Sequence, residues 1–284
     1  MLRASHLVPS LILSAFTLGA CVESTELGGD ELEGKVIGGD DGCPAWGCTG
    51  NSPTMGPFDF HELDLGGSDN KEGVAIAGAE LQNGTAVRVA FRDGTRLVAE
   101  DNQGNRYQGS QLDGLVFKLR TPTGIYLMTI NHVTPQAQSN TKMWIGAPDR
   151  VETYEIIYAD ALTPTRTQPV CHNPPGHEMA PAGGNAWPNA FEAILFTGDR
   201  YDAYGKTVIA STYADAGEWF NLACAGSAMA KLHLSRYTTA GADATHVTVA
   251  AQRQAMLKMY TGDFCGTGWS FTRSEEHTSE LQSR

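Results

Sequence analysis

Three shortages in the amino-acid sequence limit what this chain can be. It has few basic residues, with 20 Lys and Arg against 32 Asp and Glu, a formal net charge of −12 and only 18% charged residues. This balance argues against binding to nucleic acid, which requires a basic surface. Aromatic residues make up only 8% of the chain, and no internal segment is apolar over the length needed to cross a bilayer.

Motifs of common hydrolases are missing as well. Neither Gly-x-Ser-x-Gly nor His-Glu-x-x-His occurs in the sequence. Residues 265–271 resemble the active-site segment of papain-type proteases, but Gly268 occupies the position of the nucleophilic thiol. Without that thiol no thiolate can form there. We therefore expect no catalytic residue, no metal ion and no cofactor.

The composition that remains is typical of a turn-rich protein outside the cytoplasm. The 284 residues suffice for one or two domains, and a hydrophobic content of 41% can fill a core. The chain also contains 32 Gly and 13 Pro, which indicate many turns.

The N-terminus has the features of a secretory signal. An apolar run over residues 7–20 ends in Leu-Gly-Ala immediately before Cys21. This pattern resembles the lipobox of bacterial lipoproteins, in which the cysteine thiol becomes a thioether to diacylglycerol. The resemblance implies a signal peptide over residues 1–20, lipid attachment at Cys21 and, because Val22 follows instead of Asp, sorting to the outer membrane. An ordinary signal peptide followed by an unrelated cysteine is the alternative.

Residues 21–55 are expected to form an acidic, flexible tether. Between residues 22 and 42, seven acidic side chains accompany a single basic one, Lys35, and six glycines lie among them. Such a segment stays solvated and holds the folded part away from the membrane. A calcium-binding loop is the alternative interpretation, but the spacing of the acids lacks the twelve-residue pattern.

Residues 56–170 are predicted to form a β-rich module. Over residues 74–158 apolar and polar side chains alternate, and turn sequences such as Asp93-Gly94 occur at short intervals. The pattern predicts a β-meander, either a sandwich or a partly closed barrel.

Residues 171–272 are predicted to form an α+β module. Strand patterns lie over residues 191–196, 207–213 and 218–224. A helix is expected within residues 225–235. A second helix is expected to follow an N-cap at Asp243 and to end near Gly262, with one face formed by Val249, Met256 and Tyr260.

Five cysteines other than Cys21 are candidates for disulfides: Cys43, Cys48, Cys171, Cys224 and Cys265. The oxidising cell envelope favours disulfides, although five is an odd number. Cys43 and Cys48 can close a small loop, and Cys171 can reach Cys224 if the strand ends meet. Cys265 is then left over, and the sequence alone does not fix any pairing.

The segment over residues 220–231, together with Gly262-Asp263-Phe264-Cys265 and the glycine-rich turn after it, resembles the bacterial ADYC-domain family. That family is named for an Ala-Asp-Tyr-Cys motif, in which this chain has Gly and Phe in place of Ala and Tyr. The resemblance covers about the second half of the chain. It also implies cysteines where this chain has Leu232 and Met256, so the chain lacks what would be one further disulfide. It implies a fold but no mechanism.

The last residues, 273–284, resemble the in-frame translation of a common DNA-sequencing adapter. We therefore expect the authentic sequence to stop at Thr272 and the true protein to continue beyond it. A natural amphipathic tail is the alternative.

Some residues fit either a metal site or ordinary local structure. A zinc site is one interpretation of Cys171, His172 and His177, although prolines between the histidines indicate a turn. A calcium site is one interpretation of Asp199, Asp202 and Asp263, although Asp beside Gly is common in turns.

Two further patterns suggest catalysis or phosphate binding and fail on spacing. Ser227 and Lys231 are four residues apart, one more than the Ser-x-x-Lys motif allows, and we expect both to be exposed on a helix. The triplet at residues 205–207 lies too far from Gly198 to complete a phosphate-binding loop.

The sequence therefore predicts a non-enzymatic outer-membrane lipoprotein that acts in surface binding or envelope structure. Its partners would be the membrane, through the lipid, and a glycan or protein at the cell surface. Aromatic rings for such a surface, or for the buried core, are supplied by Trp144, Trp187 and Trp219. The alternative is an envelope hydrolase whose site is completed by residues after 272.

Overall fold

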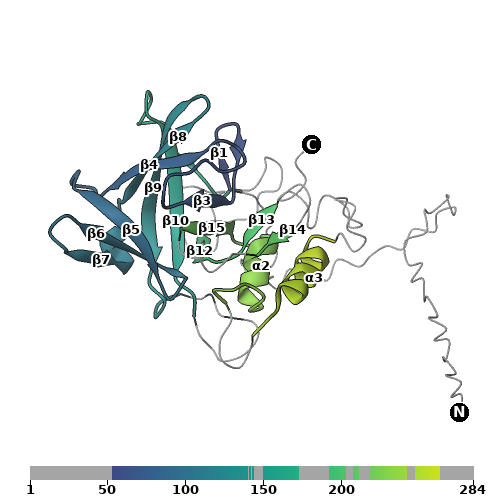
Figure 1. Ribbon diagram of the computed structural model, residues 1–284. Helices are drawn as coiled ribbons and strands as arrows, with labels where there is room; N and C mark the ends of the chain where they lie inside the picture. The colour runs from purple at the N-terminus through teal and green to yellow at the C-terminus, as the bar shows by residue number, and fades with distance from the viewer. Residues whose placement is uncertain are drawn as a thin grey trace, which may run out of the picture. The chain divides into compact units, whose positions relative to one another are not determined.

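The computed structural model describes residues 53–139, 141, 143, 150–172, 192–202, 207–210, 218–241 and 247–262. All of them lie in one compact unit of the chain. Figure 1 shows a large antiparallel sheet with two helices beside one end of it. The prediction of a mainly β protein with an α+β C-terminal part is confirmed.

Four consecutive strands form one meander: β4 (Ala75–Glu80), β5 (Ala86–Arg92), β6 (Arg96–Asp101) and β7 (Arg106–Gln108). Along β5 the even-numbered side chains are exposed and the odd-numbered ones are half-buried, as the alternating sequence predicts. Residues 93–95 connect β5 to β6, and Asp93 and Gly94 have φ angles of 52° and 72°. Asp-Gly readily adopts this left-handed backbone, which tight hairpin turns use.

A second meander continues the sheet through β8 (Val116–Thr121), β9 (Gly124–Thr134) and β10 (Thr153–Asp160). A short 3-10 helix, η1 (Gly109–Leu112), connects β7 to β8. Because β8 also pairs with β4, the two meanders form one continuous antiparallel sheet.

Strands from the second half of the chain extend this sheet beyond β10. The order there is β12 (Ala193–Thr197), β15 (Trp219–Cys224) and finally β3 (Glu62–Asp64), and β11 (Gln168–Pro169) pairs with β10 next to β12. The outermost strands, β3 and β7, do not pair with each other, so the sheet is open and not a closed barrel. Strands on both sides of residue 170 thus share one sheet.

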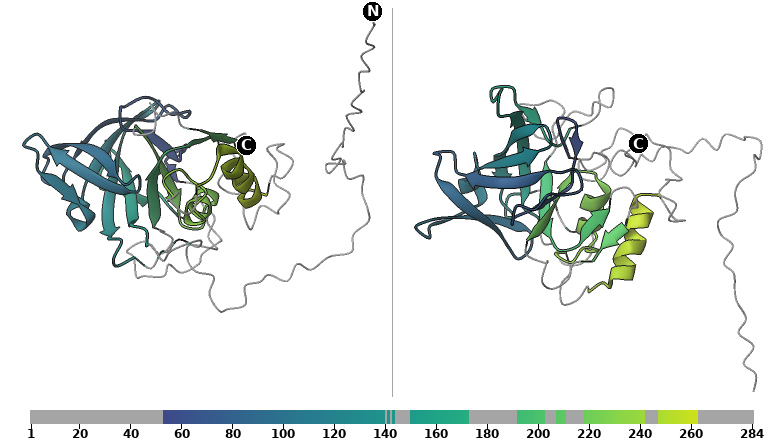
Figure 2. Two further views of the ribbon diagram at one scale, coloured as in Figure 1. Left: turned by 60° about the horizontal axis from the view of Figure 1, so that its bottom comes forward. Right: turned by 45° about the horizontal axis from the view of Figure 1, so that its top comes forward.

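Two small hairpins accompany the main sheet (Figure 2). One consists of β1 (Thr54–Met55) and β2 (Phe58–Asp59), and the other of β13 (Arg200–Asp202) and β14 (Thr207–Ile209). The strands predicted at 191–196, 207–213 and 218–224 correspond to β12, β14 and β15, with residues 211–217 outside the described part.

Buried side chains form two clusters on opposite faces of the sheet. The larger lies on its inner face, where the rings of Phe117 and Phe220 are 6.4 Å apart between centroids. The smaller lies between the sheet and the helices α2 (Ala228–Leu234) and α3 (Ala250–Tyr260). Because neighbouring residues of a strand point to opposite faces, Leu195 of β12 joins the first cluster and Phe196 the second. This end of the sheet is therefore buried on both faces.

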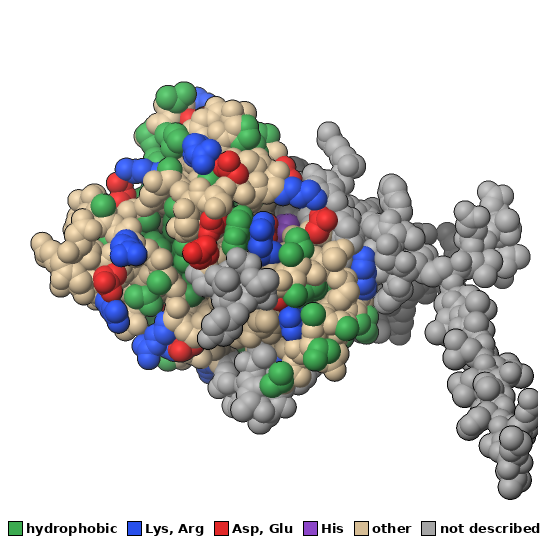
Figure 3. Space-filling view, viewed as in Figure 1, with side chains coloured by type: hydrophobic (Ala, Val, Ile, Leu, Met, Phe, Trp, Pro, Cys, Tyr) green, Lys and Arg blue, Asp and Glu red, His purple; other side chains and the backbone are tan. Residues whose placement is uncertain are grey.

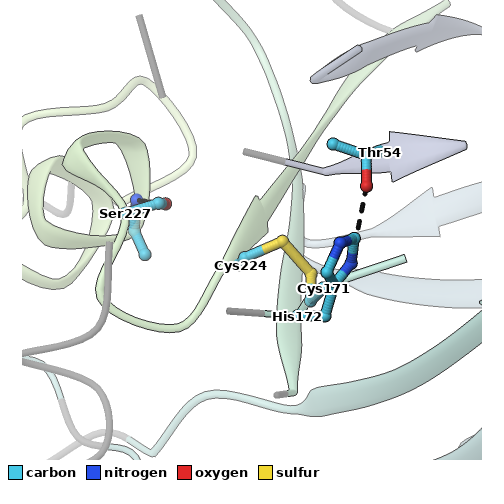
Figure 4. Close-up of a disulfide and its surroundings, with 6 residues drawn as sticks. Thr54, Cys171, His172, Cys224 and Ser227 are labelled. Carbon is cyan, nitrogen blue, oxygen red and sulfur yellow. Dashed lines mark hydrogen bonds between the residues drawn. A yellow bond between two sulfur atoms is a disulfide. The ribbon is translucent and has the colours of Figure 1, made fainter. Parts of the chain in front are cut away.

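The disulfide between Cys171 and Cys224, one of the pairings that the sequence left open, is present. Cys171 follows β11 and Cys224 ends β15, and their Cα atoms are 5.4 Å apart. Figure 4 shows the bridge between these two segments, next to His172 and Thr54. The other candidates, at positions 21, 43, 48 and 265, lie outside the described residues.

The start of the second helix differs from the prediction, whereas its predicted apolar face is confirmed at two of the three residues. Asp243 lies outside the described residues, and α3 begins at Ala250 with Val249 as its N-cap. The β-branched residues just before the helix favour extended backbone, and the Val249 N–H is satisfied by the Gln252 side chain at 2.9 Å. Met256 and Tyr260 pack against the smaller cluster, beside the buried Arg253 and Leu257, whereas Val249 is exposed.

The prediction that Ser227 and Lys231 are exposed is wrong. Ser227 is the N-cap of α2 and its hydroxyl accepts the Ala230 N–H at 2.9 Å, so the serine is buried against the helix end (Figure 4). Lys231 is buried too, as is every other residue of α2. Leu232 is a core residue of the smaller cluster and Met256 packs against it, so apolar contact joins the two helices at these positions.

Candidate functional site: an arginine trough on the sheet

The outward side of β5, β6 and β7 carries the most distinctive surface of the described residues. Val89 and Phe91 pack against the core, which turns the neighbouring side chains of β5 outward. These outward residues are Arg88, Ala90 and Arg92. The alternation that builds the core therefore also places two arginines on one exposed face.

Strand register extends this face into rows that run across the strands. In the first row Arg88 lies opposite Glu100, and Glu100 lies opposite Arg106. In the second row Ala90, Val98 and Gln108 are aligned in the same way. Arg92 lies beyond the second row, next to the turn.

These side chains enclose an open groove of about 740 Å³, which we call the arginine trough. Ala90, Val98 and Gln108 form its floor, with Arg88, Glu100 and Arg106 along one side and Arg92 on the other. In Figure 3 charged side chains surround apolar ones over these strands. The volume lies within the range of ligand-binding clefts.

The turn between β6 and β7 fixes the register of the first row. The carboxylate of Asp101 accepts the backbone N–H groups of Gln103 and Asn105 at 2.8 and 2.9 Å. It also accepts the side-chain amide of Asn105 at 2.8 Å and the hydroxyl of Tyr107 at 3.1 Å. The side-chain hydrogen bond from Asn105 is the main reason that the pKa of Asp101 is lowered. The ionised carboxylate thus holds Glu100 opposite Arg106.

The arginines of the trough differ in how fully their charge is compensated. Arg106 donates from Nε to Glu100 at 2.7 Å, and Nε of Arg92 lies 3.6 Å from a carboxylate oxygen of Asp93. Both guanidinium groups stay accessible, since the side chains of Arg106 and Arg92 are 75% and 59% exposed. Within the described part of the chain Arg88 has no ion pair. A planar guanidinium in this state can bind carboxylate or phosphate oxygens in pairs.

A second, smaller hollow lies between β3 and β13. Its volume is about 130 Å³, and its polar walls include His61, Glu62 and Arg200. Arg200 donates to both carboxylate oxygens of Glu62, at 3.0 and 2.5 Å, and its guanidinium carbon lies 3.5 Å from the ring centre of Trp219. The ion pair between Arg200 and Glu62, and the hydrogen bond between His61 Nε2 and the Tyr201 carbonyl at 2.8 Å, brace this part of the fold.

The aspartates considered for calcium are bonded to cationic side chains instead. Asp199 is fully buried and bonded to Arg253 of α3, and Asp202 lies 2.8 Å from the ammonium of Lys71. Both carboxylates therefore have cationic partners in this structure, and Asp263, the third residue of the calcium interpretation, lies outside the described residues.

The zinc interpretation fails at Cys171. Its sulfur is in the disulfide and offers no thiolate, while His172 Nδ1 lies 3.5 Å from the hydroxyl of Thr54. His177 and the triplet 205–207 are outside the described residues. In the ranges that the structure describes, no group of three or more His, Cys, Asp or Glu side chains is arranged to hold a metal ion.

Of the three tryptophans considered for ligand display, only Trp219 is described. It is half-buried at the start of β15 beneath the guanidinium of Arg200, so it neither projects freely nor lies in the core. Trp144 and Trp187 lie outside the described residues, as does the segment 265–271.

The largest pKa shifts belong to the core and not to the trough. Burial, followed by the charge of Arg236, lowers the pKa of His233 to about 3, and its ring stacks on Phe196. Burial raises the pKa of Glu152, whose carboxylate accepts the hydroxyl of Tyr154 at 2.5 Å. These buried groups therefore contribute to the stability of the fold. The trough, in contrast, has exposed charged side chains and a groove in which a ligand can bind.

The trough was missed in the sequence analysis because its rows form only on folding. Arg88 and Arg92 are visible as the polar positions of an alternating strand, but Glu100 and Arg106 join them through the register of two hairpins. The one available signal was the absence of any acidic residue from β5 in a strongly acidic chain.

The similarity to known proteins lies in the part of the sequence that follows the trough residues. Residues 109–280 match a family model described as the ADYC domain. No curated protein and no solved structure matches the chain. Among the described residues, none of the helices has the length and apolar character that crossing a membrane needs. The trough residues, from Arg88 to Gln108, precede the matched segment.

Proposed function

The chain belongs to the ADYC-domain family, and from this premise we propose that it is a non-enzymatic outer-membrane lipoprotein whose folded part binds an anionic ligand in the arginine trough. The trough is the observation that carries the binding role. It places three exposed arginines around one groove on a chain whose formal net charge is −12. A local cationic groove on an acidic protein favours a ligand that brings its own negative charge.

The envelope location is supported by the N-terminal sequence. The apolar run and the Leu-Gly-Ala that precede Cys21 have the pattern of a lipid-attachment site. Several acyl chains on one residue anchor a protein stably, whereas a single chain does so only marginally. The acidic segment at residues 22–42 then gives the folded part distance from the membrane.

Binding can be tested with immobilised dextran sulfate as a generic polyanion and uncharged dextran as the reference. We expect the full-length protein, purified in detergent, to bind dextran sulfate and to release it as salt increases. Replacing both Arg88 and Arg106 by alanine removes two exposed charge contacts and should weaken binding about tenfold.

Arg120→Ala is the matched control for this measurement. Arg120 is also exposed on β8 of the same sheet, 3.1 Å from Asp69, but it does not line the trough. Circular dichroism checks that each variant is folded. Absence of binding, or an equal loss in the control, would contradict the proposal.

Lipid attachment is tested separately by mass spectrometry of the N-terminal peptide. We expect Cys21 to carry diacylglycerol and Cys21→Ala to remove the protein from the outer-membrane fraction. An unmodified Cys21 would refute the anchor. Covalent labelling by an acyl-enzyme probe would refute the non-enzymatic role.

A further inference from the structure

The first row of the trough has an alternating charge that restricts which anions fit. Across the strands it presents Arg88, then Glu100, then Arg106. The two arginines stand two strand spacings apart, or about 10 Å. A ligand with a negative charge at every unit would place one of its charges against Glu100, whose carboxylate accepts from Arg106 at 2.7 Å and stays 45% exposed. The row therefore favours acidic groups on alternate units, with neutral hydroxyl groups between them to donate to the Glu100 carboxylate.

The floor of the trough requires a ligand with some apolar surface. Ala90 and Val98 present methyl groups, and Gln108 adds an amide that can donate and accept. The C–H face of a sugar ring can cover such methyl groups while its hydroxyls reach the polar walls. A bare polyphosphate has no apolar face, and a fatty acid has no hydroxyl groups for Glu100 and Gln108.

The trough also lacks a platform for stacking. Among the strands that form it, the aromatic residues Phe91 and Tyr107 pack against the core, and although Phe91 borders the trough, its ring lies 5.1 Å from that of Phe220 between centroids. Proteins that bind single-stranded nucleic acid stack bases on exposed aromatic rings, so nucleobases find no such support here. Recognition has to come from the charged walls and the small floor.

The direction of the ligand follows from the arrangement of the rows. Arg88 and Arg92 are four residues apart on β5, which separates the two walls by about 14 Å along the strand. The floor between them continues from β5 to β7, across the strands, and the groove is open. A chain-like ligand can thus lie along the floor and extend beyond the trough.

From these features we infer that the arginine trough binds a linear acidic polysaccharide with a carboxylate on every second sugar, which lies across β5, β6 and β7. The acidic sugars contact Arg88 and Arg106, and the neutral sugar between them contacts Glu100. This inference rests on the proposed function and specifies the ligand class of the same site.

The test compares four soluble polymers on the full-length protein by isothermal titration calorimetry. Hyaluronan carries a carboxylate on alternate sugars, polygalacturonate carries one on every sugar, polyphosphate has no sugar ring, and dextran has no charge. We expect hyaluronan to bind more tightly than the other three. Arg88→Ala should weaken hyaluronan about fivefold, as expected for one exposed charge contact, whereas Arg120→Ala should not.

Glu100→Gln provides a readout that a merely structural role would not change. Replacing the central negative charge by an amide should strengthen polygalacturonate relative to hyaluronan, because the repulsion at the middle of the row is gone. If dextran sulfate binds in the trough but hyaluronan shows no preference, or if Glu100→Gln leaves the ratio unchanged, this inference fails and the proposed function stands. If none of the polyanions binds, both fail.

Discussion

The guanidinium of Arg253 is bonded to the carboxylate of Asp199, and the two side chains are 9% and 0% exposed. Both Nε and Nη2 donate to Asp199, and Nη1 donates to the carbonyl of Thr248 at 2.6 Å. Asp199 stands just before β13, so this buried pair joins α3 to the small β13–β14 hairpin beside the sheet. The C-terminal helix thus depends on a charge contact that no local sequence pattern reveals.

We predict that removing one partner of this pair is far more damaging than removing an exposed one. Arg253→Met leaves Asp199 buried without this cation and should lower the free energy of unfolding by about 3–5 kcal/mol. Lys71→Met breaks the exposed contact to Asp202 and should cost no more than about 1 kcal/mol. Urea denaturation measures both, and similar losses for the two variants would contradict the prediction.

The disulfide between Cys171 and Cys224 is expected to contribute a large part of the stability. It closes a loop across 53 residues of sequence. By the loop-entropy relation, a loop of this length corresponds to about 4 kcal/mol. A Cys171→Ala/Cys224→Ala double variant should show this loss, and a reducing agent should destabilise the natural protein but not the variant. Equal sensitivity to reduction in both proteins would count against it.

Ser227 should matter as a helix cap. Ser227→Ala removes the hydroxyl that accepts the Ala230 N–H and should lower the free energy of unfolding by about 1 kcal/mol. Ser110→Ala, in η1, is a control because no capping role belongs to its side chain. Thermal unfolding compares the two, and an unchanged midpoint for Ser227→Ala would show that the cap contributes nothing.

Stability should depend on acid through His233. Its pKa is lowered from 6.5 to about 3 in the folded state, chiefly by burial. Between these values the unfolded chain binds a proton that the folded chain does not, so stability rises with pH across this window and is lost as pH falls. The slope from this residue is at most about 1.4 kcal/mol per pH unit.

His233→Phe isolates that contribution. A phenyl ring can keep the stacking on Phe196 but cannot take up a proton, so the variant should lose this part of the slope between pH 6.5 and 3. Denaturation curves at a series of pH values supply the comparison. Identical slopes for the variant and the natural protein would show that His233 does not titrate on unfolding.

The sequence predicts local structure in this protein better than it predicts the site. Alternation at Val87, Val89 and Phe91 identifies β5, and Asp93-Gly94 identifies its turn, because both signals act over a few residues. The exposure of Lys231 was predicted wrongly because its burial comes from packing between α2 and segments that are distant in sequence. The helix start was misplaced because an acidic residue resembles a cap wherever it precedes a helical pattern, while the observed cap is made by the side chain of Gln252.

The trough, like the burial of Lys231, could not be predicted from local sequence patterns. Arg88, Glu100 and Arg106 are separated in sequence by a hairpin turn at each step, and only the register of β5, β6 and β7 brings them into one row. A shift of one residue in either hairpin would send the side chains of the shifted strand from this face to the core face. The sequence contains the charges, but their order across the strands is a property of the folded sheet.

The turn at Gly94 has a consequence for how the trough can respond to its ligand. The Gly94 carbonyl accepts the N–H of Thr197 at 2.7 Å, which ties this end of the β5–β6 hairpin to β12. Because the Arg92 end of the trough is tied to β12 in this way, a polymer bound as we propose would be aligned from that end.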